Sequence, residues 1–517
     1  MKKLKISDSN ERKIGAVLSY LQIGISSAGT LLYTPAMLRM IGQNEYGLYG
    51  TVTSFISLLS LLNMGFSSSY IKFYSVYKSK NEYDKIQSFN SLFFTVFAVI
   101  ALLALLIGGF FSFNLNFVFD KGLTQDEYSK ARIMMILLTL STVFSFLTTV
   151  FNCYIGAHQK FVFTKSLGIV STILTFIVNL IVLFFGFGAV GLVVVTVSLN
   201  CLTNLIYIFF CFKTLKIKFD FKNIDKKVFK KVFAFSGLIA INLIVDKINT
   251  GIDSVLLGRF CGTAVVAVYT IGASLNSHFT GFSVAISGVF TPRVHEIVNS
   301  YEMDSLNQRK ALTDFFVKVG RIQYLLMALL ASGVVFFGKP FIRFWAGEGY
   351  DDAYYIAIIM IIPSIVSLTQ NVGIEIQRAE NRHHYRSYIY GIMALGNLGI
   401  SIYLCQIWGG IGSALGTGIA CVFSTIILMN IVYHKKINID VTQYWKNIGR
   451  QTLGMIVPFA VGALIMKFVN IDSLLKLLLW IAIYTLVYIV FVWFFSTNKY
   501  EKDLFMSAFR KINMIKR

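Results

Sequence analysis

The chain has 517 residues, of which 56% are hydrophobic and only 14% are charged, and its formal net charge is +22. Soluble globular proteins carry about 25% charged residues, so the composition excludes an ordinary water-soluble domain and indicates a protein built for lipid. Six cysteines lie singly, without a CxxC or Cys/His cluster, so the sequence predicts neither disulfides nor a metal centre.

About twenty consecutive apolar residues cross a bilayer, and fourteen such runs follow one another along the chain. We therefore predict an all-α polytopic membrane protein with fourteen transmembrane helices. The predicted spans are 14–38, 48–71, 90–117, 133–153, 166–186, 190–212, 232–257, 264–290, 322–338, 353–375, 388–407, 411–432, 451–468 and 475–496.

The positions of the basic residues predict the orientation of these spans. Of the 47 Lys and Arg residues, 37 fall in the two termini and the even-numbered loops and 9 in the odd-numbered loops. Because Lys and Arg concentrate in cytoplasmic loops, both termini are expected in the cytoplasm. The positive charge is then topological, and it calls for no nucleic-acid partner, although basic flanks also attract anionic lipid headgroups.

One polar signature, an arginine followed at fixed spacing by a glycine and a tyrosine, occurs twice. The two copies are Arg39-x-x-Gly42-x6-Tyr49 and Arg259-x-x-Gly262-x6-Tyr269, 220 residues apart. Weaker matches at offsets of 221 or 222 pair Lys72 with Arg293, Ala157 and Lys160 with Ala379 and Arg382, and Gly188 and Gly191 with Gly409 and Gly412. Matches in order at a nearly constant offset indicate a duplicated membrane module, as in many transporters.

The offset covers six spans, an even number, so both copies are expected to enter the membrane in the same direction. We predict two like-oriented six-helix lobes around a central cavity, followed by two extra C-terminal helices. The predicted boundaries are 1–220 for the N-lobe, 221–434 for the C-lobe and 435–517 for the last two spans and a cytoplasmic tail.

The signature segments resemble a known family. The stretch from Pro35 to Tyr49, with its Gly42-x-x-Glu45-Tyr-Gly47-x-Tyr turn, resembles the first-span exit of the polysaccharide or oligosaccharide flippase branch of the MOP superfamily. The run Asp253-x-x-Leu-Leu-Gly258-Arg-Phe-x-Gly262 followed by Tyr269 is similar to the seventh-span exit of that branch.

This resemblance implies a transporter of alternating access in the bacterial cytoplasmic membrane. Its expected cargo is a lipid-linked sugar repeat unit, usually on undecaprenyl diphosphate, turned from the inner to the outer leaflet for cell-surface polysaccharide synthesis. No cofactor is expected beyond a coupling ion, proton or sodium. Expected partners are the glycolipid, membrane lipids and a polymerase or another polysaccharide-assembly protein, and the chain is expected to act as a monomer.

The seventh span carries the densest set of polar residues inside a predicted membrane helix. Asn242, Asp246, Asn249 and Asp253 recur at i, i+4, i+7 and i+11, which places them on one helical face, with Lys247 beside them. Ionisable groups cost several kcal/mol inside a bilayer, so each needs a reason. Lys247 could meet the diphosphate, and Asp246 or Asp253 could bind a proton or cation. The alternative is a buried polar network that only packs the lobes together.

Other candidates are single residues with a structural alternative each. Arg39 and Arg259 could form an outer gate or guide an anionic headgroup, or they could cap the ends of their helices. Lys72 and Arg293 could make first contact with the pyrophosphate or simply anchor the spans. His278 and Glu375 are possible cavity residues, although a lone membrane histidine is more often only hydrogen-bonded.

Two other classes of membrane protein are alternatives to the flippase. A multidrug or cation antiporter of the same superfamily usually stops at twelve spans, so the extra pair here favours the glycolipid flippase. A polytopic glycosyltransferase or ligase would need a sizeable extramembrane loop with catalytic residues. The longest predicted loop, 291–321, shows no metal-ligand or nucleophile–base spacing, so the chain is predicted not to be an enzyme.

Overall fold

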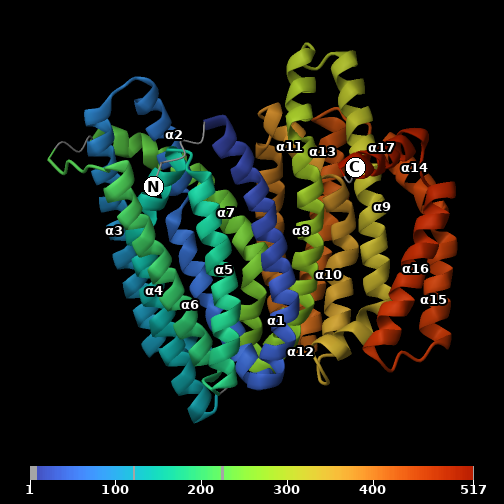
Figure 1. Cartoon of the computed structure of the whole chain (residues 1–517), viewed down its shortest axis with the longest axis horizontal. Helices are drawn as coiled ribbons and strands as arrows, with labels where there is room; N and C mark the ends of the chain where they lie inside the picture. Colours follow the sequence, from blue (N-terminus) through green and yellow to red (C-terminus); the bar gives the residue numbers. More distant parts are fainter. Residues whose placement is uncertain (1–7, 120–122, 223–225, 516–517) are drawn as a thin grey trace. The chain divides into compact units, whose positions relative to one another are not determined.

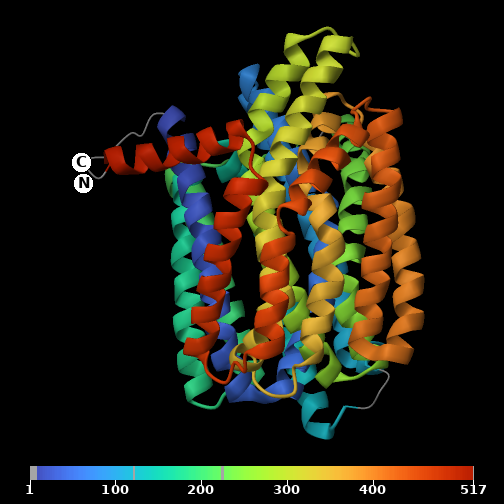
Figure 2. The ribbon, with the colours of Figure 1, turned by 90° about the vertical axis from the view of Figure 1, so that its right-hand side faces the viewer.

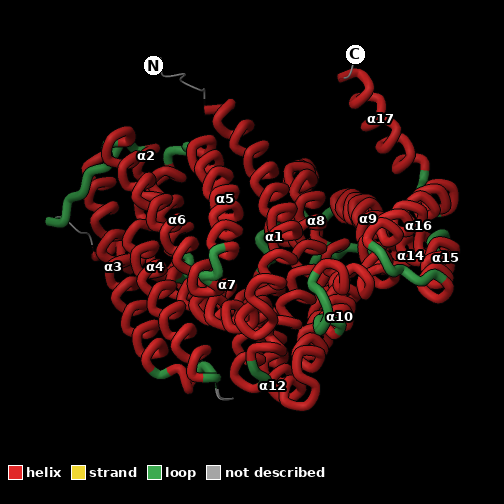
Figure 3. The backbone as a smooth tube through the Cα atoms, turned by 60° about the horizontal axis from the view of Figure 1, so that its bottom comes forward, coloured by secondary structure: helices red, strands yellow, loops and turns green. Residues whose placement is uncertain are grey.

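The computed structural model describes residues 8–119, 123–222 and 226–515, and these residues form helices joined by turns without a strand (Figure 1 and Figure 3). The expected all-α fold is thereby confirmed. The chain divides into two compact units: unit 1 comprises residues up to Thr270 together with 405–409, and unit 2 comprises the remainder.

Unit 1 contains the first seven helices and the start of the eighth. They are α1 (Asp8–Leu59), α2 (Phe66–Ser79), α3 (Tyr83–Phe113), α4 (Gln125–Ala157), α5 (Phe161–Phe184), α6 (Gly188–Phe210), α7 (Lys226–Phe260) and α8 (Thr263–Ser300). Because α7 packs against α1 and α2, the compact unit extends to residue 270, past the lobe boundary predicted at residue 220. That boundary concerns the repeat and stays a prediction.

Unit 2 contains most of α8 and the later helices, apart from residues 405–409 of α12. They are α9 (Leu306–Trp345), α10 (Asp352–Thr369), α11 (Asn371–Ala379), α12 (His384–Cys421), α13 (Met429–Lys435), α14 (Val441–Leu453), α15 (Ile456–Phe468), α16 (Leu474–Phe495) and α17 (Lys499–Ile515). A π-helical stretch, Val422–Leu428, joins α12 to α13.

Among the described residues, ten helical segments are long and apolar enough to cross a membrane, or eleven if the bent pair α14 and α15 is one span. Two of the ten, Ile14–Ser79 with 66 residues and His384–Lys435 with 52, contain a non-helical glycine, Gly42 and Gly409 respectively. At 1.5 Å per residue such segments are far longer than the ~30 Å apolar core of a bilayer. The predicted number of fourteen spans stays a prediction.

The turns of the two halves recur at the spacing of the sequence repeat. Five residues with positive φ in the first half are matched in the second half 220 to 223 residues later. The pairs are Gly42 with Gly262, Asn81 with Asp304, Gln159 with Asn381, Gly188 with Gly409, and Lys216 with Asn438. Because positive φ is uncommon outside glycine, such a coincidence supports the duplication independently of side-chain similarity.

The second span of unit 1 is interrupted, whereas its counterpart in the repeat is continuous. Between α1 and α2 lies a 3₁₀ turn, Ser60–Asn63, followed by Met64 and Gly65 with φ of 44° and 71°. A Cβ on Gly65 would lie 2.5 Å from Ile239 of α7, so only glycine fits there. The α8 helix runs unbroken from Thr263 to Ser300.

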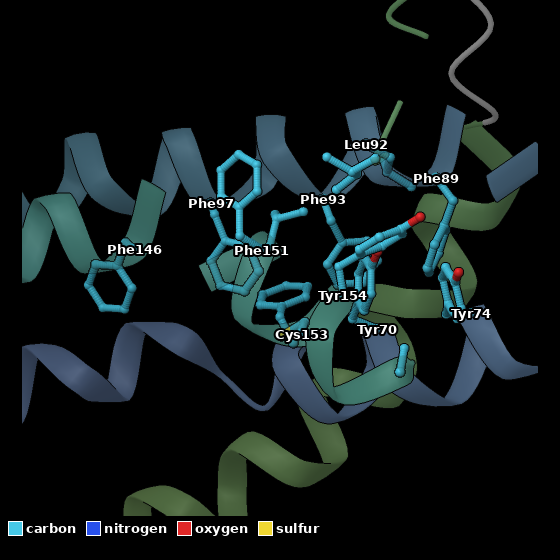
Figure 4. Close-up of a cluster of buried hydrophobic side chains, with 14 of the residues drawn as sticks. Tyr70, Tyr74, Phe89, Leu92, Phe93, Phe97, Phe146, Phe151, Cys153 and Tyr154 are labelled. Atoms are coloured by element: carbon cyan, nitrogen blue, oxygen red, sulfur yellow. The ribbon is translucent and has the colours of Figure 1, made fainter. Parts of the chain in front are cut away.

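Aromatic side chains fill the core of unit 1 between α2, α3 and α4 (Figure 4). Tyr70, Phe93 and Phe97 are fully buried there, and the Tyr70 and Phe93 rings meet edge to face with centroids 5.1 Å apart. The Tyr70 hydroxyl donates a hydrogen bond to Oδ1 of Asn90 at 2.5 Å, and Asn90 donates to the carbonyl of Lys218 at 3.0 Å. The buried polar groups of this core are therefore paired, as a low-dielectric interior requires.

Polar side chains also join α4 to α6 within the predicted membrane region. Asn200 donates to the hydroxyls of Ser141 and Ser145 at 2.8 and 2.9 Å, and Thr148 donates to Oδ1 of Asn204 at 2.9 Å. Hydrogen bonds between membrane helices contribute about 0.6 to 2 kcal/mol each. This ladder therefore fixes the register of the two helices.

Two expectations about the second half are wrong. The long loop predicted at 291–321 is a helical hairpin, in which α8 and α9 extend beyond the neighbouring helices of unit 2 (Figure 2). Apolar residues on the facing sides, among them Val294 and Phe316, are fully buried and hold the hairpin together. The predicted single span at 353–375 is broken at Gln370, seven residues after Pro363.

The turn at Gly42 gives a test of the signature glycine. Gly42 has φ of 77° and ψ of 172° with no atom near its missing Cβ, so Gly42→Ala strains only the backbone and should cost about 1–3 kcal/mol. Gly24, in the same helix, is also uncrowded but has no positive φ, so Gly24→Ala should be neutral or stabilise by up to ~1 kcal/mol. Thermal unfolding in one detergent measures both, and equal effects would contradict the conformational role of Gly42.

Candidate functional site

The polar face of α7 lies in unit 1, and its members differ in environment. Asp246 is exposed, Lys247 and Asn249 are half-buried, and Asp253 is only 3% exposed. Lys247 lies along its own helix, with Cε 3.4 Å from the position that a Cβ on Gly251 would take. Asn242 belongs to the same helix, but its side chain lies outside the described residues. The predicted face is thus graded, from exposed at Asp246 to buried at Asp253.

Asp253 is bonded to a residue of the second signature. The Tyr269 hydroxyl, on α8, donates to Oδ2 of Asp253 at 2.7 Å. The tyrosine that closes the Arg-x-x-Gly-x6-Tyr motif therefore satisfies a buried carboxylate, a contact that sequence spacing does not predict. A carboxylate held by a buried hydroxyl donor can pack two helices together, and it can also take up a proton; both readings of Asp253 remain predictions.

The first signature builds a close helix contact in unit 1. Gly47 packs on the start of α8, where a Cβ would lie 1.8 Å from the carbonyl oxygen of Thr263. Nearby, a Cβ on Gly258 of α7 would lie 2.3 Å from Cγ2 of Thr51. Small residues let membrane helices approach to backbone contact, which strengthens van der Waals packing. The glycines of both signatures are thus explained by turns and contacts, without a ligand.

Glu45 of the first signature has a structural partner that sequence alone did not reveal. Its Oε1 accepts a hydrogen bond from the backbone N–H of Ala189 at 2.8 Å, at the first turn of α6. Its Oε2 lies 3.4 Å from Nζ of Lys130 on α4. A carboxylate at a helix N-terminus satisfies a backbone donor and interacts favourably with the helix dipole. Glu45 thereby ties the α1 turn to α4 and α6.

The two signature arginines both lie in unit 1. Arg39 is exposed, three residues before the Gly42 turn. Arg259 donates from Nη1 to the carbonyl of Phe117 at 3.3 Å, in the turn after α3. Capping a carbonyl of another segment supports a structural role for Arg259. A gating role for either arginine remains a prediction.

Lys72 and Arg293, matched by the repeat, have different neighbours. The Lys72 ammonium lies 3.7 Å from the ring centroid of Phe235 on α7, a cation–π contact. Arg293 pairs with Glu296 on α8 and lines a cavity of about 330 Å³ between α8 and α9, which Asp314 and Lys318 also line. Both cations are exposed and therefore accessible to an anionic ligand.

His278 and Glu375 both lie in unit 2 but on different elements. His278 is half-buried in α8. Glu375 accepts from Nη1 of Arg378 at 2.6 Å, one turn away on the short helix α11. Because Glu375 already has a cation at hydrogen-bond distance, coupling to another cation would have to displace Arg378. The candidate role of each residue remains a prediction.

The basic pair from the weaker repeat match also has acidic partners. Lys160 lies 3.3 Å from Glu11 in unit 1, and Arg382 lies 2.6 Å from Asp304 in unit 2. The Arg382 guanidinium holds the pKa of the Asp304 carboxyl below its usual value. Each half thus has a basic residue at the equivalent turn, and in each half an acidic residue from another segment pairs with it.

A buried polar network, absent from the sequence predictions, surrounds the break between α10 and α11. Gln370 donates to Oδ1 of Asn430 at 3.1 Å, and the Trp445 indole donates to the same oxygen at 3.1 Å. The hydroxyls of Thr369 and Tyr444 are 2.7 Å apart. Isolated glutamines and asparagines in apolar runs were the available signal, but Gln370 and Asn430 lie 60 residues apart in sequence, and Thr369 and Tyr444 lie 75 apart.

The fold is shared with solved membrane transport proteins. A lipid II flippase, MurJ, in an inward closed conformation superposes with a TM-score of 0.70 at 20% identity, covering 92% of this chain and 97% of that one. An inward-facing MATE multidrug transporter of the MOP superfamily superposes with a TM-score of 0.51 at 13% identity, covering 81% and 99%. The chain is therefore a multi-pass membrane protein of the fold found in these transporters.

Sequence comparison gives the family. Residues 15–298, more than half of the chain, match the family described as Polysaccharide biosynthesis protein. The chain belongs to this family, which confirms the resemblance seen in the signature segments.

Two curated bacterial relatives are similar to the chain. A putative O-antigen transporter of Shigella flexneri is 21% identical over 203 residues, which span 39% of this chain and 46% of that protein, less than half its length. An uncharacterized membrane protein, EpsK, of Bacillus subtilis (strain 168) is 21% identical over 490 residues, 92% of this chain and 94% of that one.

The contacts of Glu45 give a prediction for stability. Glu45→Ala leaves the Ala189 N–H without its acceptor and Lys130 without one of its two acidic partners, so it should destabilise unit 1 by about 1–2 kcal/mol. Glu82→Ala removes an exposed pair with Lys85 and should cost at most about 0.5 kcal/mol. Thermal melting in detergent compares the two, and an unchanged Glu45→Ala variant would refute the capping role.

Proposed function

We propose that this protein flips a lipid-linked oligosaccharide or polysaccharide repeat unit, carried on undecaprenyl diphosphate, across the bacterial cytoplasmic membrane by alternating access. The observation that carries the proposal is the family match over residues 15–298, in a polysaccharide biosynthesis family. The fold supports it, because the similarity to the lipid II flippase extends over 92% of the chain. A duplicated helical bundle is also the architecture expected of a transporter.

The orientation follows from charge and is part of the proposal. Both termini and the α8–α9 hairpin belong to the cytoplasmic side, because 37 of the 47 basic residues lie in the termini and even-numbered loops. The glycolipid would then enter from the cytoplasmic leaflet and leave in the outer leaflet. A polymerase or another polysaccharide-assembly protein would receive it there.

The proposed site residues follow from chemistry and exposure. Lys247 is a half-buried cation in the predicted membrane region and suits the diphosphate, which is the charged part of the cargo. Lys72 and Arg293 are exposed cations on α2 and α8 that suit first contact with it. Asp246 and Asn249 share the helical face of Asp253 and suit a coupling proton or sodium ion.

The alternatives are less well supported. A drug or cation antiporter has the same superfamily fold, but the MATE structure reaches a TM-score of 0.51 against 0.70 for the lipid II flippase. A glycosyltransferase or ligase would need an extramembrane catalytic segment. The segment predicted to be that loop, 291–321, is a helical hairpin packed on itself, which supports a protein that is not an enzyme.

Lys247 provides the direct test. In inverted vesicles or proteoliposomes with a prenyl-diphosphate-linked oligosaccharide, Lys247→Ala should slow translocation about tenfold or more, since hydrogen bonds to a charged group contribute about 1.5–3 kcal/mol. Lys231→Ala, an exposed position on the same helix, is the matched control and should transport normally. Normal flipping by the Lys247 variant would remove this residue from the site. Drug export without any flipping by the unaltered chain would favour the antiporter.

Asp253 can be tested for coupling separately from packing. Asp253→Asn keeps an acceptor for Tyr269 but cannot ionise, whereas Tyr269→Phe removes the hydroxyl and leaves the carboxylate. If Asp253 carries a coupling proton, the Asn variant should lose the pH dependence of transport and the Phe variant should retain it, with at most a shifted midpoint. If both variants keep the unaltered pH dependence, Asp253 is a packing residue.

A further inference from the structure

The last helix, α17, runs crosswise to α16 and projects away from it (Figure 2 and Figure 3). Only Ser496, Thr497 and Asn498 separate the two helices, so the chain turns sharply where the span ends. Trp493, near this end of α16, lies under the Lys502 ammonium, which is 5.9 Å from its ring. Tryptophan is enriched where membrane helices meet the headgroup layer. These positions put α17 at the level of a membrane surface.

A buried ion pair fixes the start of α17 to the bundle. Glu501, 1% exposed, receives hydrogen bonds from Nε and Nη2 of Arg321 on α9 at 2.7 and 3.0 Å. Arg321 also donates to the carbonyl of Ser496 at 3.0 Å. Asn498 and Glu501 cap each other reciprocally at the first turn of α17. Because both charges are buried and bidentate, this latch holds the helix in one direction.

The face of α17 that carries Glu501 is otherwise apolar. Leu504 and Phe505 are half-buried, and Phe505 packs against the core of α9, α15 and α16. Helical spacing continues this register through Phe509 and Ile512, beyond the latch. Asp503 and Ser507, on the other side, are exposed. One apolar stripe therefore begins on the bundle and continues along the part of α17 that projects away from it (Figure 3).

The charge of α17 suits an anionic surface. Its basic residues are Lys499, Lys502, Arg510 and Lys511, and its acidic residues are Asp503 and Glu501, the second of which is neutralised by Arg321. An amphipathic helix with basic residues on its polar side and flanks is the pattern of helices that lie in the membrane interface. A water-exposed helix would have no use for the apolar stripe.

We infer that α17 lies in the interfacial layer of the adjacent leaflet, with its apolar stripe against acyl chains and its basic residues among anionic phospholipid headgroups. The Arg321–Glu501 latch sets its direction, so the two C-terminal spans are tied to the leaflet surface. This role is independent of the cargo and of the proposed flipping activity.

Hydrogen–deuterium exchange of the full-length protein in nanodiscs tests the inference. Amides of 502–515 should exchange at least about tenfold more slowly in phosphatidylglycerol than in phosphatidylcholine nanodiscs, and high salt should reduce the difference, because each basic residue near an anionic surface contributes about 1 kcal/mol. Equal exchange in both lipids, whether slow as in a protein-packed helix or fast as in a solvated one, would overturn the inference.

Matched variants locate the interacting face. Phe509→Glu puts a charge on the apolar stripe and should abolish the protection by anionic lipid. Ser507→Glu adds the same charge on the exposed side and should leave most of it. If the two variants behave alike, the effect is one of net charge and no face of α17 is buried in lipid. Glu501→Gln should raise exchange in 499–505 in both lipids, because it weakens the latch itself.

Discussion

The constraint on which this structure depends is that lipid offers no hydrogen bonds to a peptide backbone. Inside the bilayer every N–H and C=O must be satisfied within a helix, so reversals of the chain are confined to the helix ends. There the backbone takes left-handed conformations that few residues adopt at low cost. Glycines at 42, 188, 262 and 409 meet this demand, and asparagines at 81, 381 and 438 do so at other turns. The two halves therefore keep residues with positive φ at matching turns, where the chain reversal requires this conformation.

The same constraint governs the polar side chains. A buried polar group without a partner costs free energy, and in lipid water cannot supply the partner. Asn200 and Asn204 are therefore matched by hydroxyls of α4, and Gln370 is matched by Asn430 where a helix breaks. The strongest such pairing is the bidentate ion pair of Arg321 and Glu501, in which Arg321 also donates to the carbonyl of Ser496. Each of these contacts specifies which helices meet, because an apolar contact alone would tolerate many partners.

The sequence predicted what depends on local pattern. Long apolar runs predict helices, because a helix of about twenty apolar residues spans the bilayer with its backbone hydrogen bonds formed internally. The signature at Gly42 and Gly262 predicts turns. Features that depend on distant residues were not predicted. The segment 291–321 is too polar for a span, yet it is helical, and Val294 and Phe316 belong to one buried apolar cluster that holds the hairpin together. Pro363, which precedes the break, does not predict that the helix ends at Gln370. The partner of Gln370 is Asn430, which lies 60 residues away in sequence.

In the candidate site, too, the sequence predicts the helical face on which a residue lies but not the residue that it contacts. Helical spacing placed Asp253 in a polar row on α7. The Tyr269 hydroxyl that donates a hydrogen bond to Asp253 comes from the next helix, and helical spacing does not predict a contact of that kind. Glu45 was visible as part of a motif, while its role at the first turn of α6 required the fold, because Ala189 is 144 residues away. Composition and period therefore locate polar groups, and tertiary contacts decide what those groups do.

The two halves are alike in their turns and unlike in their intramembrane polar groups. The position of the repeat that holds Asp253 in the second copy holds Tyr33 in the first, and the Tyr33 hydroxyl is buried without a hydrogen-bond partner among the described residues. Gly65 interrupts the second span, whereas the matching stretch of α8 is unbroken. Duplicated modules need the same backbone conformations at their turns. Positions away from these turns, such as Tyr33 and Asp253, can differ between the copies without loss of the fold. The carboxylates and the lysine of α7, which the first copy lacks at the matching positions, are therefore the residues that we propose for function.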